Sequence, residues 1–127
     1  MTAIGLILAI KISITALLIG GPFLFMPEER LAKMTGVTGG SSIFRLYGVA
    51  ILALLTGYTS GFWTIAEGHF PWGVAAMGMV SNGGATLVLL TSGAWQRKPA
   101  STSFVAAVTL ALVAASLNSS YALVPLW

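Results

Sequence analysis

The sequence predicts an all-α fold, a bundle of four transmembrane helices, and three observations point to it. Hydrophobic residues make up 57% of the 127 residues. Charged residues make up only 7%, whereas a soluble domain usually carries about a quarter. The apolar residues gather in four runs, each near the roughly 20 residues that a helix needs to cross the bilayer core. A chain of this length is expected to form one integral membrane domain, residues 1–127.

Polar or proline-containing loops separate the four apolar runs and set the expected helix ends. Lys11 is the one charged residue inside the first run, and Arg45 lies close to the start of the second. The third and fourth runs contain no charged residue. Pro22 follows two glycines in the first run, and it predicts a kink or an early end of that helix. The expected spans are residues 4–26, 43–66, 72–93 and 103–124.

The basic residues lie near the ends of the apolar runs and form no patch of the kind that binds nucleic acid, so no nucleic-acid partner is expected. They gather in the first and third loops, which the positive-inside rule places in the cytoplasm. Both chain termini are then expected on the non-cytoplasmic side. The first apolar run is too long for a secretory signal, so we expect a retained helix in a bacterial inner membrane or an organelle membrane. These basic residues are Arg30, Lys33, Arg45, Arg97 and Lys98.

Two basic residues inside the spans are candidates for a functional role. A lysine at mid-bilayer costs roughly 2.5–3.5 kcal/mol, so Lys11 needs an explanation. Its side chain either extends to the outer interface, pairs with Glu67, or serves as a ligand or proton site. Arg45 is either an anchor that touches lipid phosphate or an inward-facing residue that ties the first loop through Glu28 or Glu29.

Three further polar residues are candidate binding residues for a pigment or a lipid. Glu67 and His69 flank the hairpin between the second and third spans. They are either ordinary loop residues or contacts to a pigment magnesium or a lipid headgroup. Asn82 lies inside the third span and is expected to make a helix–helix hydrogen bond. No cofactor is certain from these residues, and the candidates are a bound lipid, a chlorophyll or bacteriochlorophyll, and a carotenoid.

Small residues recur at four-residue spacing in the later spans, which is typical of helices that approach closely in lipid. They are expected to pack the bundle together. The alternative is a dedicated interface with other membrane-protein subunits or with further copies of this chain. The residues expected in helix packing are Gly57, Gly61, Gly78, Ala107, Ala111 and Ala115.

Several kinds of chemistry lack their usual residues in this sequence. There is no cysteine and only one histidine, which excludes disulfides, thiolate metal sites and haem held by two histidines of this chain. No nucleophile elbow, phosphate-binding glycine loop or zinc-protease motif occurs. With three acidic residues in all, no buried carboxylate pair is available for acid–base catalysis. We therefore expect no metal site, no catalytic residues and no enzyme activity by this chain alone.

The segment from residue 18 to residue 28, LIGGPFLFMPE, is followed by FRLYG at residues 44–48. This pattern resembles the DoxX-like group of small four-helix membrane proteins. In that group one helix ends in an apolar-proline segment and the next opens with arginine, an apolar pair and glycine. The resemblance implies an accessory role, with Arg45 and Gly48 as the matching positions. The cysteines of redox-linked members are absent here, so the resemblance does not extend to a thiol role.

The leading hypothesis for function is a non-catalytic accessory subunit of a larger membrane complex, respiratory or photosynthetic. It would pack against partner helices and hold lipid or pigment beside the machinery of electron transport or photosynthesis. The alternative is a small homo-oligomeric transporter or channel that uses Lys11, Glu67 and Asn82. A third hypothesis is a redox or lipid enzyme that borrows its cofactor from a partner.

Overall fold

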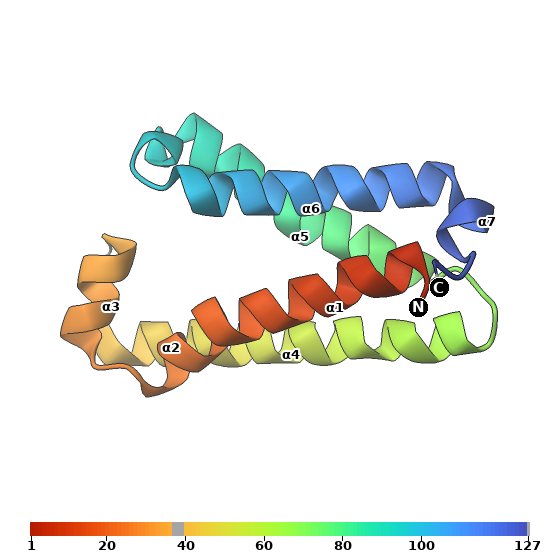
Figure 1. Cartoon of the computed structure of the whole chain (residues 1–127). Helices are drawn as coiled ribbons and strands as arrows, with labels where there is room; N and C mark the ends of the chain where they lie inside the picture. Colours follow the sequence, from red (N-terminus) through yellow and green to blue (C-terminus); the bar gives the residue numbers. More distant parts are fainter. Residues whose placement is uncertain (37–39, 127) are drawn as a thin grey trace. The chain divides into compact units, whose positions relative to one another are not determined.

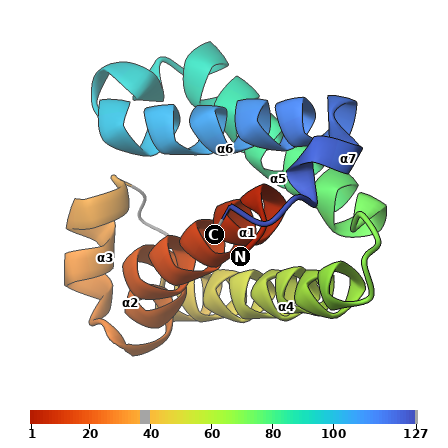
Figure 2. The same ribbon diagram turned by 45° about the vertical axis from the view of Figure 1, so that its right-hand side comes forward.

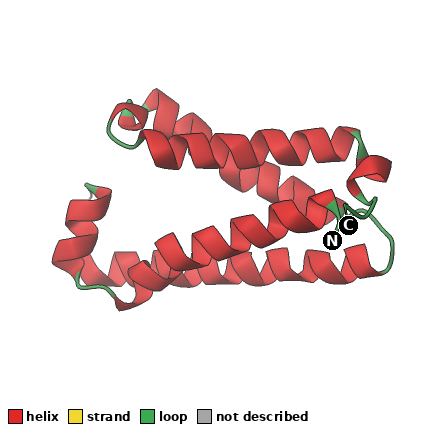
Figure 3. Cartoon of the chain, viewed as in Figure 1, coloured by secondary structure: helices red, strands yellow, loops and turns green. Residues whose placement is uncertain are grey.

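The computed structural model of the chain describes residues 1–36 and 40–126. The regular elements of this part are all helices, as Figure 3 shows, apart from one isolated β-bridge between Thr2 and Pro125. Four helical segments are long and apolar enough to cross a membrane, which confirms the all-α, four-helix fold class. These segments are Ala3–Phe25, Gly40–Ala66, Trp72–Thr91 and Pro99–Leu117.

Figure 1 labels the α-helices of the chain. The first span comprises three consecutive helical elements, and a short helix follows it before the second span begins. A one-turn 3₁₀ helix joins the third and fourth spans. In chain order the elements are α1 (Ala3–Thr15), the π-helical η1 (Ala16–Gly20), α2 (Gly21–Phe25), α3 (Glu28–Thr35), α4 (Gly40–Ala66), α5 (Trp72–Thr91), the 3₁₀ helix η2 (Ala94–Gln96), α6 (Pro99–Leu117) and α7 (Ser119–Ala122).

The first span continues through Pro22 and does not end early. A proline has no N–H to donate, and its ring crowds the carbonyl one turn earlier. The helix accommodates this by widening into η1 just upstream, where the Gly21 N–H donates to the Ala16 carbonyl five residues back. A Cβ at Gly21 would lie 3.3 Å from that carbonyl oxygen, so a glycine suits this position.

The end of the first span follows from the next proline. A residue that precedes proline is pushed out of the helical region, and Met26, before Pro27, has φ −76° and ψ 148°. The helix therefore ends at Phe25. Pro27 is the N-cap of α3, and Gly36 caps the C-terminus of that helix in the left-handed conformation with φ 74°.

The fourth span lies nearer the N-terminus than expected. It begins at Pro99 instead of residue 103, because a proline is well suited to the first turn of a helix. It ends at Leu117, since Asn118 leaves the helical region with φ −122° and ψ 45°. The residues that follow form the separate turn α7.

Contacts divide the chain into two compact units, which we describe separately. Unit 1 contains Met1–Leu8 and the chain from Ser60 onward, and unit 2 is Ala9–Thr59.

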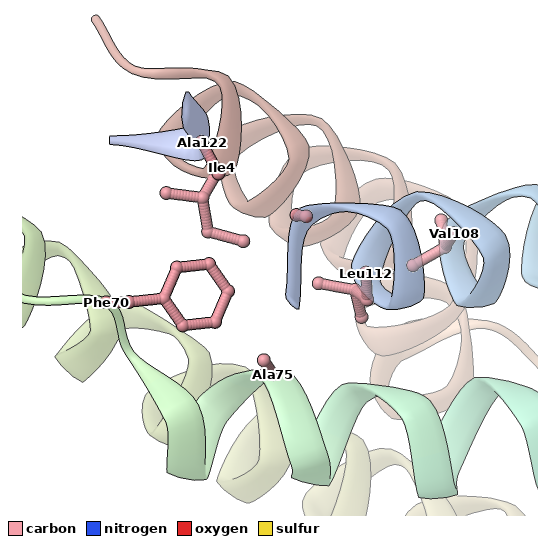
Figure 4. Close-up of a cluster of buried hydrophobic side chains, with 7 residues drawn as sticks. Ile4, Phe70, Ala75, Val108, Leu112 and Ala122 are labelled. Carbon is pink, nitrogen blue, oxygen red and sulfur yellow. The ribbon is translucent and has the colours of Figure 1, made fainter. Parts of the chain in front are cut away.

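In unit 1, α5 and α6 pack against each other along their length. Their contact is filled by apolar side chains, and Figure 4 shows the ring of Phe70 between Ile4 and Ala75. The first and last residues also meet in this unit, where the Leu126 N–H donates to the Met1 carbonyl at 3.0 Å. The two ends of the described chain therefore lie together. The buried core consists of Ile4, Phe70, Ala75, Val108, Leu112, Ala115 and Ala122.

In unit 2, η1 and α2 run alongside the first part of α4, which Figure 2 shows from a second direction. Two glycines permit this close approach. A Cβ at Gly20 would lie 3.4 Å from Leu52, and one at Gly48 would lie 3.0 Å from Leu24. The helix α3 buries Leu31 against a small aromatic cluster formed by Phe23 and Phe44. Its charged residues remain exposed.

Candidate functional site

Lys11 of α1 is the most unusual residue of unit 2, because it is a lysine in a membrane-length helix whose side chain is only 5% exposed. Its Nζ lies 5.9 Å from the centroid of the Tyr58 ring on α4, within the range of a cation–π interaction. Tyr58 itself is 0% exposed. The side chain of Lys11 is thus packed against a buried ring of α4, and its extension to the outer interface stays a prediction.

Thr15 lies one helical turn after Lys11 and on the same face of α1. It is 2% exposed, and its Oγ1 is the one buried side-chain oxygen or nitrogen of the described chain without a hydrogen-bond partner. The sequence reasoning missed this residue and Tyr58. The four-residue spacing from Lys11 is the signal by which Thr15 is recognisable as a neighbour.

Arg45 of α4 caps the end of the first span. Its Nη1 donates to the Phe23 carbonyl and its Nη2 to the Met26 carbonyl, each at 3.0 Å. In a continuing helix the Phe23 carbonyl would accept from residue 27, but Pro27 has no N–H. The arginine supplies the missing donor, and its positive charge suits a helix C-terminus.

These bonds bear on the prediction that Arg45 faces inward, while its contact with lipid phosphate stays a prediction. Arg45 does tie the first span and loop to the second span, but it binds backbone carbonyls and not the carboxylates of Glu28 or Glu29. Gly48 lies one turn further along α4 and is buried beneath Leu24. Arginine and glycine at this spacing therefore act together. The arginine caps the C-terminus of the first span, and the glycine leaves space for a side chain of α2.

Asn82 of α5 is 2% exposed and lies in unit 1. Its Nδ2 donates to the Gly78 carbonyl at 2.8 Å and to the Ser81 Oγ at 3.3 Å. Thr86 in turn donates to the Asn82 carbonyl at 2.8 Å. These bonds all lie within α5, and the helix–helix hydrogen bond expected of Asn82 stays a prediction.

Glu67 and His69 lie in the connection between α4 and α5, and both are exposed. The turn is made by Gly68, whose φ is 79°. Asn82 is about 15 Å along the axis of α5 from its first residue, so the structure does not bring it together with these two residues. The described residues contain no group of three histidine, cysteine or acidic side chains that could hold a metal ion. Pairing of Lys11 with Glu67 would join the two units and stays a prediction.

The small residues expected in helix packing have different environments. Gly61 is buried, and a Cβ there would lie 2.9 Å from Leu8 and 3.3 Å from Val74. Gly78 and Ala115 are also buried, whereas Gly57 and Ala111 are half-buried. Ala107 is exposed, so the alanines of α6 run from the core of unit 1 to its surface.

On that surface, unit 1 has a shallow, open groove of about 370 Å³, which we call the alanine groove. Its walls come from the start of α1, the second half of α6, and α7. The lining is almost entirely apolar and mostly alanine. The lining residues are Ala3, Ile7, Ala111, Ala114, Ala115, Asn118, Tyr121 and Ala122.

Comparisons of the chain with models of protein families, with curated proteins and with solved structures found no match. The resemblance to the DoxX-like group therefore stays a prediction.

Proposed function

We propose that this protein is a non-catalytic accessory subunit of a larger membrane complex and that a transmembrane helix of a partner packs into the alanine groove. The groove is the observation that carries the proposal. Helices associate in lipid when small side chains let their backbones approach, because lipid tails give no hydrophobic force for association. Ala111 and Ala114 provide such a surface along one side of α6.

The rim of the groove supports the same proposal. Tyr121 stands 78% exposed at one end, and Asn118 is exposed beside it. Aromatic and amide side chains at the membrane interface favour contacts that a lipid tail does not make. A lipid or a pigment such as a chlorophyll or carotenoid would fill the remaining apolar space around the partner helix. The resemblance stated above makes respiratory and photosynthetic complexes the first to examine.

The test is purification in a mild detergent, followed by measurement of the mass of the intact complex. The wild-type protein is expected to elute with at least one other membrane chain in fixed ratio. Ala114→Leu fills the groove and is expected to release that chain. Ala107→Leu makes the same change at an exposed position of α6 outside the groove and is expected to retain it. A wild-type protein that purifies alone and monodisperse would contradict the proposal.

The buried Lys11 ammonium favours one second candidate, a homo-oligomeric transporter or channel that uses Lys11, Glu67 and Asn82. Ionisable residues at membrane depth often mark the path of an ion. Lys11→Leu in reconstituted vesicles separates the two functions. Loss of flux with normal insertion would favour transport, and loss of complex assembly would favour the accessory role.

A further inference from the structure

Residues 119–126, which we call the strap, leave the direction of α6 and run to the first residues of α1 within unit 1 (Figure 1). The break comes at Asn118, whose backbone leaves the helical region. Its Nδ2 donates to the Ala114 carbonyl at 3.1 Å, so its side chain bonds the last turn of α6. Asparagine favours such breaks, because its side chain competes for the backbone hydrogen bonds of a helix.

The far end of the strap is tied to the start of the chain by backbone contacts. Thr2 and Pro125 form an antiparallel β-bridge, and the Leu126 N–H donates to the Met1 carbonyl at 3.0 Å. Thr2 is itself bound to the first turn of α1, because its Oγ1 accepts the Gly5 N–H at 3.2 Å. The strap therefore joins the end of α6 to the beginning of α1.

Two of the three walls of the alanine groove depend on the strap. Its helix α7 supplies Tyr121 and Ala122 directly. The wall from α1 consists of Ala3 and Ile7, which lie just after the residues that the strap holds. The wall from α6 is independent of the strap, because α6 is a continuous helix packed against α5.

The strap is held more by its backbone bonds than by its side chains. Of its eight residues Ala122 alone is buried, whereas Tyr121 is 78% exposed and Val124 is 54% exposed. Segments with few buried apolar contacts open at low free-energy cost. A ligand that binds better to the closed form is therefore able to shift the strap toward closure.

We propose that the strap is a clamp on the alanine groove, so that a partner helix binds tightly only while residues 119–126 are fastened to the start of α1. This inference rests on the accessory role proposed above and adds the regulation of its binding surface. A helix in the groove contacts α1, α6 and α7 while the strap is closed, whereas an open strap leaves it only the wall from α6. The partner therefore favours closure of the strap, and by linkage closure favours the partner to the same degree.

A disulfide across the β-bridge tests the clamp, because this chain has no cysteine of its own. Facing residues of antiparallel strands have Cα atoms about 4.5–5.5 Å apart, which is within the reach of a disulfide. Thr2→Cys combined with Pro125→Cys is therefore expected to lock the strap when oxidised. In the complex purified in mild detergent, the partner is expected to dissociate about fivefold more slowly from the oxidised protein than from the reduced one. The reduced protein is the matched control, since it carries the same two substitutions.

Leu126→Pro makes the opposite change, because proline has no N–H to donate to the Met1 carbonyl. Hydrogen exchange is expected to become about fivefold faster at Gly5 and Leu6, an effect of the size of one backbone hydrogen bond. The N–H groups of these two residues both donate to Thr2, so they report on the start of α1. Leu126→Ala keeps the N–H and is the matched control, with exchange expected to equal that of the wild type.

The clamp is overturned by any one of three results. Oxidation of the double-cysteine protein yields no disulfide, which would mean that the strap is not seated at Thr2. The oxidised and reduced forms release the partner at the same rate. Leu126→Pro and Leu126→Ala show the same exchange at Gly5 and Leu6. A wild-type protein that purifies without a partner contradicts the accessory role alone, and the exchange comparison then decides whether the strap holds the start of α1.

Discussion

Replacement of Arg45 by methionine is expected to destabilise the protein by about 3 kcal/mol. Methionine keeps most of the apolar stem and removes the guanidinium, so the change tests the two hydrogen bonds to the Phe23 and Met26 carbonyls. A hydrogen bond from a charged donor contributes about 1.5–3 kcal/mol. Arg45 is half-buried, so we take the lower end of that range for each bond. The Phe23 carbonyl then has no other donor, since Pro27 cannot replace the arginine.

The assay is reversible unfolding in mixed micelles of mild detergent and dodecyl sulfate, monitored by circular dichroism. Arg97→Met is the control, because it removes one positive charge from an exposed position outside the spans. Arg45→Lys is expected to recover about half of the loss, since a lysine has one nitrogen and not a fork of two. The loss is expected to be smaller in a Pro27→Ala background, where residue 27 regains an N–H. A loss below about 0.5 kcal/mol for Arg45→Met, comparable with that of an ordinary surface substitution, would refute the reasoning.

Three further predictions use the same unfolding assay. Gly48→Ala is expected to lower the free energy of unfolding by about 1 kcal/mol, because its Cβ would lie 3.0 Å from a side chain of α2. Gly84→Ala in α5 has nothing within 4 Å of its Cβ and is expected to leave stability unchanged or raise it by up to about 1 kcal/mol, so equal losses at the two glycines would contradict this account. Leu31→Ala is expected to lower the free energy of unfolding by about 2 kcal/mol and to release α3. Increased hydrogen exchange in Glu28–Thr35 would detect that release, and unchanged exchange would argue against the docking of α3. Gly61→Leu is expected to lower the free energy of unfolding by about 2 kcal/mol, because its Cβ would lie 2.9 Å from Leu8. A variant as stable as the wild type would show that the helices do not pack tightly at this glycine.

Hydropathy alone was sufficient to predict the number of spans and their approximate positions. A backbone in lipid must satisfy its polar groups internally, so each long apolar run had to become a helix. The helix ends were predicted less well where local chemistry decides them. Pro99 starts α6 early and Asn118 ends it early, and the hydropathy of these neighbourhoods does not reveal either effect.

The sequence identified some of the residues of the candidate site and missed others. The sequence identified Lys11 and Arg45 because a charge in an apolar run stands out against its neighbours. It did not identify Thr15 or Tyr58, since a threonine or tyrosine in a membrane helix is unremarkable until its partners are known. It also suggested Glu28 or Glu29 as the partner of Arg45, whereas the structure pairs Arg45 with backbone carbonyls. The Tyr58 ring beside Lys11 was not anticipated.

The amino-acid sequence by itself determined that this chain has four membrane-length helices, where proline breaks or widens them, and which charges lie at membrane depth. Only the tertiary structure decided which face of each helix is buried, and therefore which carbonyls Arg45 caps and where the Thr15 hydroxyl lies. The physical reason is that these helices are apolar all round. In water a helix buries its apolar stripe, but in lipid both the packed and the exposed faces are apolar, so the order of residues does not record which face meets another helix.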